Sequence, residues 1–245
     1  VNSGVSWTPS ATIPVRDAVG LEARLTASDL YMASATGTIY RSTDAGASWS
    51  AVGTVSASDL VDMVFRTDGA LLLLTATGSI MESTDLGVSF SGVATLTGSN
   101  FVSLCRAPLG KLYALAATGD VYESLDNGLN WIAKSTITVS DARRIRARGS
   151  DLIVLSGSGD IYRSTDAASS WSAVGTLSQV GMRALLAVGS TLYAASQEGH
   201  VWSSLDGGAS WQIAGSMQQL SLTAMASDQP AVTGVGPGVA STIQL

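Results

Sequence analysis

A short motif recurs along the whole chain at an almost constant spacing. It reads YRSTDAGASW at 40–49 and returns four more times with small changes, and the five copies end at Trp49, Phe90, Trp131, Trp171 and Trp211. These aromatic residues are 41, 41, 40 and 40 residues apart, and the fragment NSGVSW ends 42 residues earlier, at Trp7. A fixed period of about 40 residues is typical of a repeat array in which each period is one structural unit.

Each period consists of short stretches that alternate apolar and polar residues between turn residues. In residues 21–55 the stretches are LEARLTAS, DLYMASATG, TIYRSTDAG and ASWSAVGTV. This alternation predicts four short β-strands, and no window shows sustained helical spacing. Four strands in about 40 residues indicate a propeller blade. The sequence therefore predicts an all-β, six-bladed β-propeller with four antiparallel strands per blade.

The same period predicts the blade boundaries and the closure of the ring. Blades are expected at about 19–55, 60–96, 100–137, 141–177 and 181–217, with a sixth formed by about 220–245 plus 1–13. The C-terminal residues offer only three strands, so the N-terminal strand is expected to join them as the fourth. This closure would hide both sheet edges. Residues 1–245 are thus expected to form a single propeller domain.

The motif S-T-D-x-G-x-S-W resembles the Asp-box, or bacterial neuraminidase repeat, of sialidases, sortilin-type receptors and photosystem II assembly factors. Five copies keep the aspartate, at Asp44, Asp85, Asp126, Asp166 and Asp206. A carboxylate at the head of a tight turn can accept bonds from backbone NH groups two or three residues on, and a following glycine permits a positive φ. Ala168 occupies the glycine position of the fourth copy.

We expect the boxes to be structural. The closing aromatic residues, Trp7, Trp49, Phe90, Trp131, Trp171 and Trp211, are expected to cover the apolar interior of their blades. One carboxylate per turn, repeated around a ring, does not converge on a cation, so no metal site and no cofactor is expected.

Arginine is the feature that stands out from the repeat, with eleven arginines against two lysines and the run ARRIRAR at 142–148. Three of them lie thirteen residues before the glycine that ends a second strand, which suggests a common register. The candidates for binding a carboxylate or an acidic protein loop at the channel mouth are Arg24, Arg106, Arg143, Arg144, Arg146, Arg148 and Arg183. The alternative is that these arginines pair between blades with Glu22, Asp62, Asp141 or Asp151.

No catalytic residues are expected. Only Phe65 and Phe101 among the aromatic residues lie outside repeat positions, which leaves little for a stacking surface. The lone His200 is expected at a strand end on the surface and the lone Cys105 in the core. The segment TIPVRD at 12–17 lacks the Arg-Ile-Pro motif of the sialidases that the boxes resemble.

Composition limits the partners. Charged residues make up 13% of the chain and the net charge is −6, which argues against nucleic acid. No apolar run is long enough for membrane insertion, and the first residues show no signal peptide. Another protein is the expected partner and a glycan stays open, as do the oligomeric state and the identity of the partner.

These observations favour a non-catalytic propeller that acts as a binding or structural assembly module. Its surface, rich in small residues and poor in loops, resembles structural modules of virus particles and secreted proteins. The sequence-based expectation is therefore a virion component, such as a phage tail or fibre part, in a virion or extracellular location. The alternatives are an assembly factor with an arginine-rich binding face and a sialidase-like glycoside hydrolase.

Overall fold

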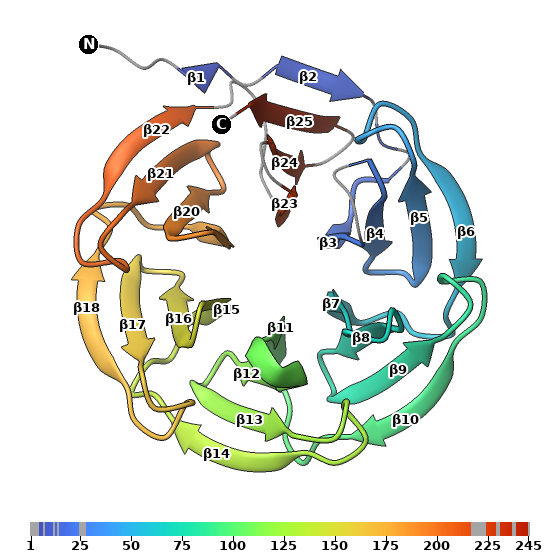
Figure 1. The fold of residues 1–245 in the computed structure, drawn as a ribbon, viewed down its shortest axis with the longest axis horizontal. Helices are drawn as coiled ribbons and strands as arrows, with labels where there is room; N and C mark the ends of the chain where they lie inside the picture. Colours follow the sequence, from blue (N-terminus) through green and yellow to red (C-terminus); the bar gives the residue numbers. More distant parts are fainter. Residues whose placement is uncertain are drawn as a thin grey trace.

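The computed structural model describes the backbone of residues 5–6, 8–11, 13, 15–24, 28–216, 224–228, 231–236 and 239–244, and the side chains of residues 13, 15–24 and 28–216. Its strands form sheets that radiate from a central axis, as in a β-propeller (Figure 1). A short 3-10 turn, η1 (Pro108–Gly110), connects two strands. No helix in the described part of the chain is long and apolar enough to span a bilayer.

Five sheets have four strands each. Their strands are β3 (Ala18–Ala23), β4 (Leu30–Ser34), β5 (Thr38–Ser42) and β6 (Ser50–Thr54); β7 (Leu60–Phe65), β8 (Leu71–Thr75), β9 (Ser79–Ser83) and β10 (Ser91–Thr95); β11 (Phe101–Arg106), β12 (Leu112–Ala116), β13 (Asp120–Ser124) and β14 (Ile132–Thr136); β15 (Ala142–Arg148), β16 (Asp151–Ser156), β17 (Asp160–Ser164) and β18 (Ser172–Thr176); and β23 (Ala224–Asp228), β24 (Ala231–Gly236) and β25 (Val239–Gln244) with β2 (Thr8–Ala11).

The remaining sheet has five strands. It contains β19 (Met182–Val188), β20 (Thr191–Ser196), β21 (His200–Ser204) and β22 (Gln212–Ser216), with β1 (Val5–Ser6) beside β22.

The expectation of six blades with four antiparallel strands each is therefore wrong. The structure has five blades of four strands each. The sheet that contains β19 differs from them because β1 adds a fifth strand to it. Strand β1 pairs in parallel with β22, in the register Val5↔Gly215 and Ser6↔Ser216. The physical reason is that an outermost strand leaves one row of backbone groups unpaired, and a short segment can add to it. The rest of the N-terminal stretch forms β2, which pairs antiparallel with β25.

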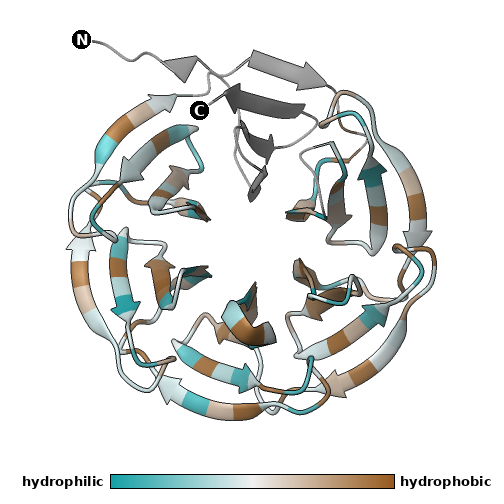
Figure 2. Cartoon of the chain, viewed as in Figure 1, coloured by the Kyte–Doolittle hydropathy of each residue, from teal (hydrophilic) through white to brown (hydrophobic). Residues whose placement is uncertain are grey.

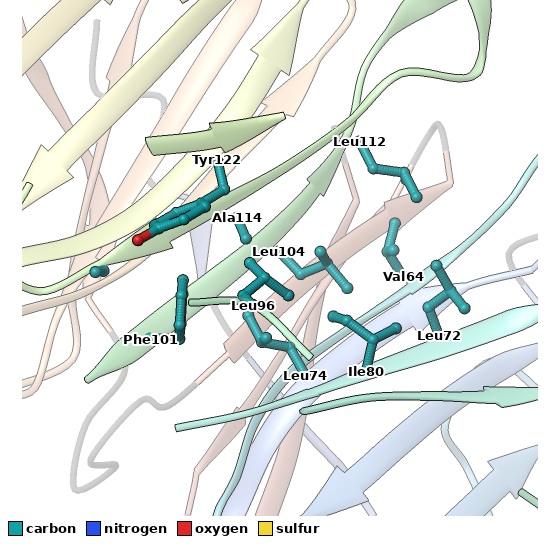
Figure 3. Close-up of a cluster of buried hydrophobic side chains, with 11 residues drawn as sticks. Val64, Leu72, Leu74, Ile80, Leu96, Phe101, Leu104, Leu112, Ala114 and Tyr122 are labelled. Carbon is teal, nitrogen blue, oxygen red and sulfur yellow. The ribbon is translucent and has the colours of Figure 1, made fainter. Parts of the chain in front are cut away.

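The core lies between neighbouring sheets rather than within one. In β8, β12 and the other second strands of the first three sheets every residue is buried, because both faces of the strand are covered by adjacent sheets. Figure 3 shows one such cluster, in which Leu72 and Ile80 from one sheet meet Leu104 and Tyr122 from the next. Apolar residues recur along the strands of every coloured sheet in Figure 2.

The ring has two different faces. The innermost strand of each sheet begins on the face that carries the turn between the second and third strands, as the pair Ala18↔Ser34 shows for β3 and β4. We call this the turn face. The innermost strand ends on the opposite face, where the turns of the repeated motif lie. A hydrogen bond from Ala45 N to Ser28 O joins one such turn to the β3–β4 connection. We call this the box face.

Candidate functional site

The Asp-box aspartates hold their own turns together. The Asp44 carboxylate accepts bonds from Ser48 N at 2.8 Å, from Ser48 Oγ at 2.6 Å and from Ser42 Oγ at 2.7 Å. The backbone donor lies four residues on, not two or three as expected. The bonds from Ser48 and Ser42 lower the pKa of Asp44 to about 2. The remaining boxes repeat these carboxylate bonds, at Asp85, Asp126, Asp166 and Asp206, with Asn130 Nδ2 in place of the serine hydroxyl at Asp126.

The closing aromatic residues pack against the clusters between sheets, as the expected structural role requires. Trp49, Phe90, Trp131, Trp171 and Trp211 are all partly buried in this way. Trp7 lies outside the described residues. Three indoles donate to the carbonyl of the glycine in their own box, for example Trp131 Nε1 to Gly128 O at 2.9 Å.

Three of the candidate arginines do not share a register. Arg24 follows the end of β3, Arg106 pairs with Leu112, and Arg146 pairs with Ile153, one position before the Ala147↔Leu152 pair. Each of these arginines lies thirteen residues before the glycine that follows the second strand, but this spacing does not give a common register. The reason is that the connections between first and second strands differ in length. Five residues separate β11 from β12, including η1, whereas two separate β15 from β16.

Two arginines replace apolar residues at the turn-face mouth of the channel. Strand pairing places Arg143 and Arg183 at the position held by valine in the first three sheets, at Val19, Val61 and Val102. Arg183 donates to Gln197 Oε1 at 2.6 and 3.1 Å. The buried Nε of Arg143 has no partner within the described part of the chain.

The residue in the facing turn also differs between the sheets that have valine on the inner strand and those that have Arg143 or Arg183. It is Ala35, Ala76 and Ala117 where the inner strand has valine, but Gly157 opposite Arg143 and Gln197 opposite Arg183. A side chain at residue 157 would come within 3.0 Å of Arg143 Nε, so glycine leaves room for the guanidinium. The sequence thus carried a second signal of this pair that the search for arginines alone missed.

Arg144 adds positive charge beside this pair. Its Nη1 donates to Val102 O at 2.7 Å and to Arg143 O at 3.1 Å. Burial lowers the pKa of Arg144; Asp62 opposes this shift, and Arg146, Arg143 and Arg183 contribute to it. Three other guanidinium groups and the carboxylate of Asp62 are therefore close enough to Arg144 to influence it. We call Arg143, Arg144 and Arg183 the arginine cluster.

Arg146 and Asp62 form a buried network across an intervening sheet. Arg146 on β15 reaches Asp62 on β7 at 3.3 Å, and on the way it donates to Ser103 Oγ on β11 at 3.0 Å. Asp62 is 2% exposed and also accepts from Ser103 Oγ and from Leu104 N, each at 2.9 Å. This pairing agrees with the interblade alternative for Arg146.

Four other arginines make contacts toward the box face. Arg24 and Arg41 both bind Asp29, at 3.3 and 2.7 Å. Arg148 donates to Ser190 O at 2.7 Å, a backbone group of the next sheet. Asp151 pairs with Arg163 in its own sheet and not with the cluster. Arg24 and Arg148 therefore do not converge with the arginine cluster.

The channel also contains a pocket of about 160 Å³ that the sequence did not indicate. Residues of β3, β7, β11, β15 and β19 line it, and Glu22, Arg106 and Arg146 supply its charges. Burial raises the pKa of Glu22 to about 7, against the opposing effect of Arg146 and Arg106. Cys105 lines the same pocket, is 3% exposed, and has its pKa raised to about 12 by burial.

The sequence analysis also missed the role of the two lysines. Lys111 and Lys134 both bind Glu123, at 3.4 and 2.9 Å, and Tyr113 donates to the same carboxylate at 2.8 Å. His200 lies 3.8 Å from Glu198 on the surface. Among the described residues, no three histidine, cysteine or acidic side chains gather as metal ligands would.

Comparisons with known proteins agree with this architecture. Residues 1–95 match the family model described as the DUF6242 beta propeller domain. No curated protein gives a significant match. The chain contains a β-propeller domain. The Asp-box family itself stays a prediction, since the match is to a different propeller family.

Solved structures show the same fold at low sequence identity. YCF48 from Cyanidioschyzon merolae is 12% identical, with 98% of each chain covered and a TM-score of 0.66. YCF48 bound to D1 peptide is 17% identical, with 92% of this chain and 76% of that chain covered and a TM-score of 0.61. A GH74 enzyme of Niastella koreensis is 20% identical, with 93% of this chain but 36% of that chain covered and a TM-score of 0.60.

Proposed function

We propose that the chain is a non-catalytic propeller that binds an acidic segment of a protein partner through its arginine cluster. The observation that carries the proposal is the replacement of valine by Arg143 and Arg183 at two adjacent sheets, with Arg143 Nε left without a partner among the described residues. Buried donors are normally satisfied, so an unpaired guanidinium nitrogen favours a ligand or water at that point. Arginine also recognises carboxylates in a bidentate manner.

Electrostatics support the same choice of ligand. The whole chain carries a net charge of −6, so a local group of arginines stands against an acidic background. Such a local field steers a partner of opposite charge to one place on the surface. An acidic protein segment is therefore expected to be attracted to the arginine cluster.

A propeller of the same fold with a bound peptide supports a protein ligand. One YCF48 structure contains a D1 peptide, and this likeness favours the assembly-factor form of the proposal over a virion part. No comparison reported above supports a virion component. The virion or extracellular location stays a prediction.

The enzyme alternative has less support. The GH74 enzyme shares the fold, but the chain spans only 36% of that enzyme. The carboxylates of Asp29, Glu82, Glu123 and Asp151 are all engaged in ion pairs within the propeller. A glycosidase of the usual kind needs two carboxylates facing one glycosidic bond. These contacts favour a binding role, and glycan remains the second ligand to test.

The direct test measures binding of a fluorescent acidic peptide by anisotropy at two salt concentrations. We expect the intact chain to bind a glutamate-rich peptide, more weakly as salt rises, and to ignore a peptide with glutamine at the same positions. The double change Arg143→Gln and Arg183→Gln should weaken binding about tenfold or more, equivalent to about 1.4 kcal/mol.

Arg163→Gln is the matched control, because Arg163 belongs to an ion pair toward the box face. It should leave peptide affinity unchanged. Equal binding of the acidic and neutral peptides, or full affinity in the double variant, would contradict the proposal. Turnover of a glycoside substrate would establish the enzyme alternative instead.

A further inference from the structure

The channel pocket is separate from the arginine cluster. Its lining spans three levels of the inner strands toward the box face, whereas Arg143 and Arg183 lie near the start of those strands. Strand pairing places one residue from each of five sheets at a common level of the pocket: Glu22, Val64, Cys105, Arg146 and Leu186. The volume of about 160 Å³ corresponds to roughly five water molecules at about 30 Å³ each.

Only one of the two arginines in this pocket has an ion-pair partner among the described residues. Arg106 is exposed to solvent, and its guanidinium makes no hydrogen bond or ion pair with the described residues. Arg146 is held by Asp62. Both arginines interact electrostatically with Glu22, but neither forms an ion pair with its carboxylate. An arginine without a partner beside a second guanidinium is a suitable environment for a small anion.

We propose that this pocket binds a small monovalent anion, a halide or a short carboxylate, between Arg106 and Arg146, and that protonation of Glu22 controls its occupancy. A monovalent anion of a few heavy atoms fits the volume, whereas a folded segment of a partner does not. The site goes beyond the proposed function, because it uses other residues on another level of the channel.

The sign of the pH dependence follows from the charge count. With Glu22 ionised, Arg106 and Arg146 are balanced by Glu22 and Asp62, and an anion gains little. With Glu22 protonated, one positive charge is left over. Because the pKa of Glu22 lies near 7, the protonated form predominates below that pH and the ionised form above it.

The described side chains on the neighbouring strands do not change this sign. Asp62 on β7 accepts four hydrogen bonds, from Met63, Ser103, Leu104 and Arg146. Cys105 on β11 stays a neutral thiol, because burial raises its pKa to about 12. On β15, Arg144 and Arg146 stay charged; β19 contributes Leu186 and Ala187. Strand β23 ends at Asp228, whose side chain lies outside the description.

The test follows chloride by the ³⁵Cl line width of the full chain at pH 6 and pH 8, with acetate as a competitor. Glu22 would be about 90% protonated at the lower pH and about 10% at the higher, so the apparent affinity should fall roughly tenfold. Glu22→Gln should bind equally at both pH values. Arg106→Gln should lose the broadening, and Arg148→Gln, which removes another arginine of the box face, should keep it.

A crystal soaked in bromide adds an independent readout, because its anomalous signal locates the ion. We expect one peak between Arg106 and Arg146, removed by Arg106→Gln. Competition by acetate would extend the site to carboxylates, and its absence would restrict the site to halides and overturn the carboxylate part of the proposal. Broadening that survives Arg106→Gln, a peak elsewhere, or a wild-type pH response in Glu22→Gln would overturn the proposal. None of these outcomes depends on peptide binding at the arginine cluster.

Discussion

At Ala168 the fourth Asp-box places an alanine at a φ of 64°, where the other copies have glycine at 86–98°. The alanine is fully buried, in the same cluster as Val121. Val121 occupies the repeat position that is isoleucine at Ile39, Ile80 and Ile161. The smaller valine side chain therefore accompanies the larger residue, alanine instead of glycine, at position 168. The Trp171 indole donates to Ser135 Oγ at 3.0 Å instead of to its own box.

Replacing Ala168 by glycine should therefore change stability little. Relief of the left-handed conformation gains about 1–2 kcal/mol, and glycine loses about 0.5–1 kcal/mol through chain entropy as well as a buried methyl group. We expect Ala168→Gly to lie between neutral and about 1 kcal/mol more stable in urea unfolding.

The matched comparison is Gly128→Ala. A methyl group at residue 128 would meet Leu72 Cδ1 at 3.0 Å, and its φ of 89° is strained for alanine. This variant should lose about 1–3 kcal/mol. A clear loss of stability in Ala168→Gly would show that the methyl group matters more than the backbone strain.

At the scale of elements, β15 is the strand that joins the inner strands of three sheets. Arg146 makes the connection, since its guanidinium reaches both β11 and β7. Removing one member of a buried pair leaves the other charge uncompensated, which usually costs several kcal/mol. The network therefore belongs to the stability of the ring as well as to the channel.

We expect Asp62→Asn to lower the free energy of unfolding by about 2–4 kcal/mol. Asp68→Asn is the control, because Asp68 pairs with Arg66 at 2.6 Å but is 49% exposed, and such pairs contribute less than about 1 kcal/mol. Urea unfolding of both variants measures the difference. Equal effects would mean that the Asp62 network is as weak as a surface pair.

The sequence predicted the elements better than the contacts of the arginines. The alternation in each period led to the four strands of most sheets. The repeated motif forms turns as expected, but the backbone donor to its aspartate lies four residues on. The register of Arg24, Arg106 and Arg146 was wrong because it depended on equal connections, and η1 makes one of them longer. The pairing of Arg146 with a sheet two positions away cannot be read from a linear period, since it depends on how tightly the inner strands approach the axis.

At the scale of the whole molecule, the N-terminal stretch contributes to two sheets. Strand β1 lies along β22 and β2 lies along β25. The sequence suggested the second pairing from the missing strand, but it gave no sign of the first, since a two-residue strand has no period to detect. The blade boundaries drawn from the period stay a prediction.

Removing residues 1–11 should destabilise the protein and promote association. Both β22 and β25 would then present an unpaired edge, and exposed edges recruit other strands. We expect a lower melting temperature and larger species in size-exclusion chromatography. Removing residues 1–4, which precede β1, should have little effect. A monomer of unchanged melting temperature after the longer deletion would show that these pairings contribute little.

The pairing of Thr8 with Thr242 also has a consequence for biosynthesis. At about 5–20 residues per second, a ribosome needs on the order of 10–50 s to make the residues between them. During that interval the first strands of the chain have no partner, and the circle of sheets cannot be completed. Folding of the last sheet must therefore wait until residue 242 has been synthesised, and the unpaired strands can associate wrongly during this delay.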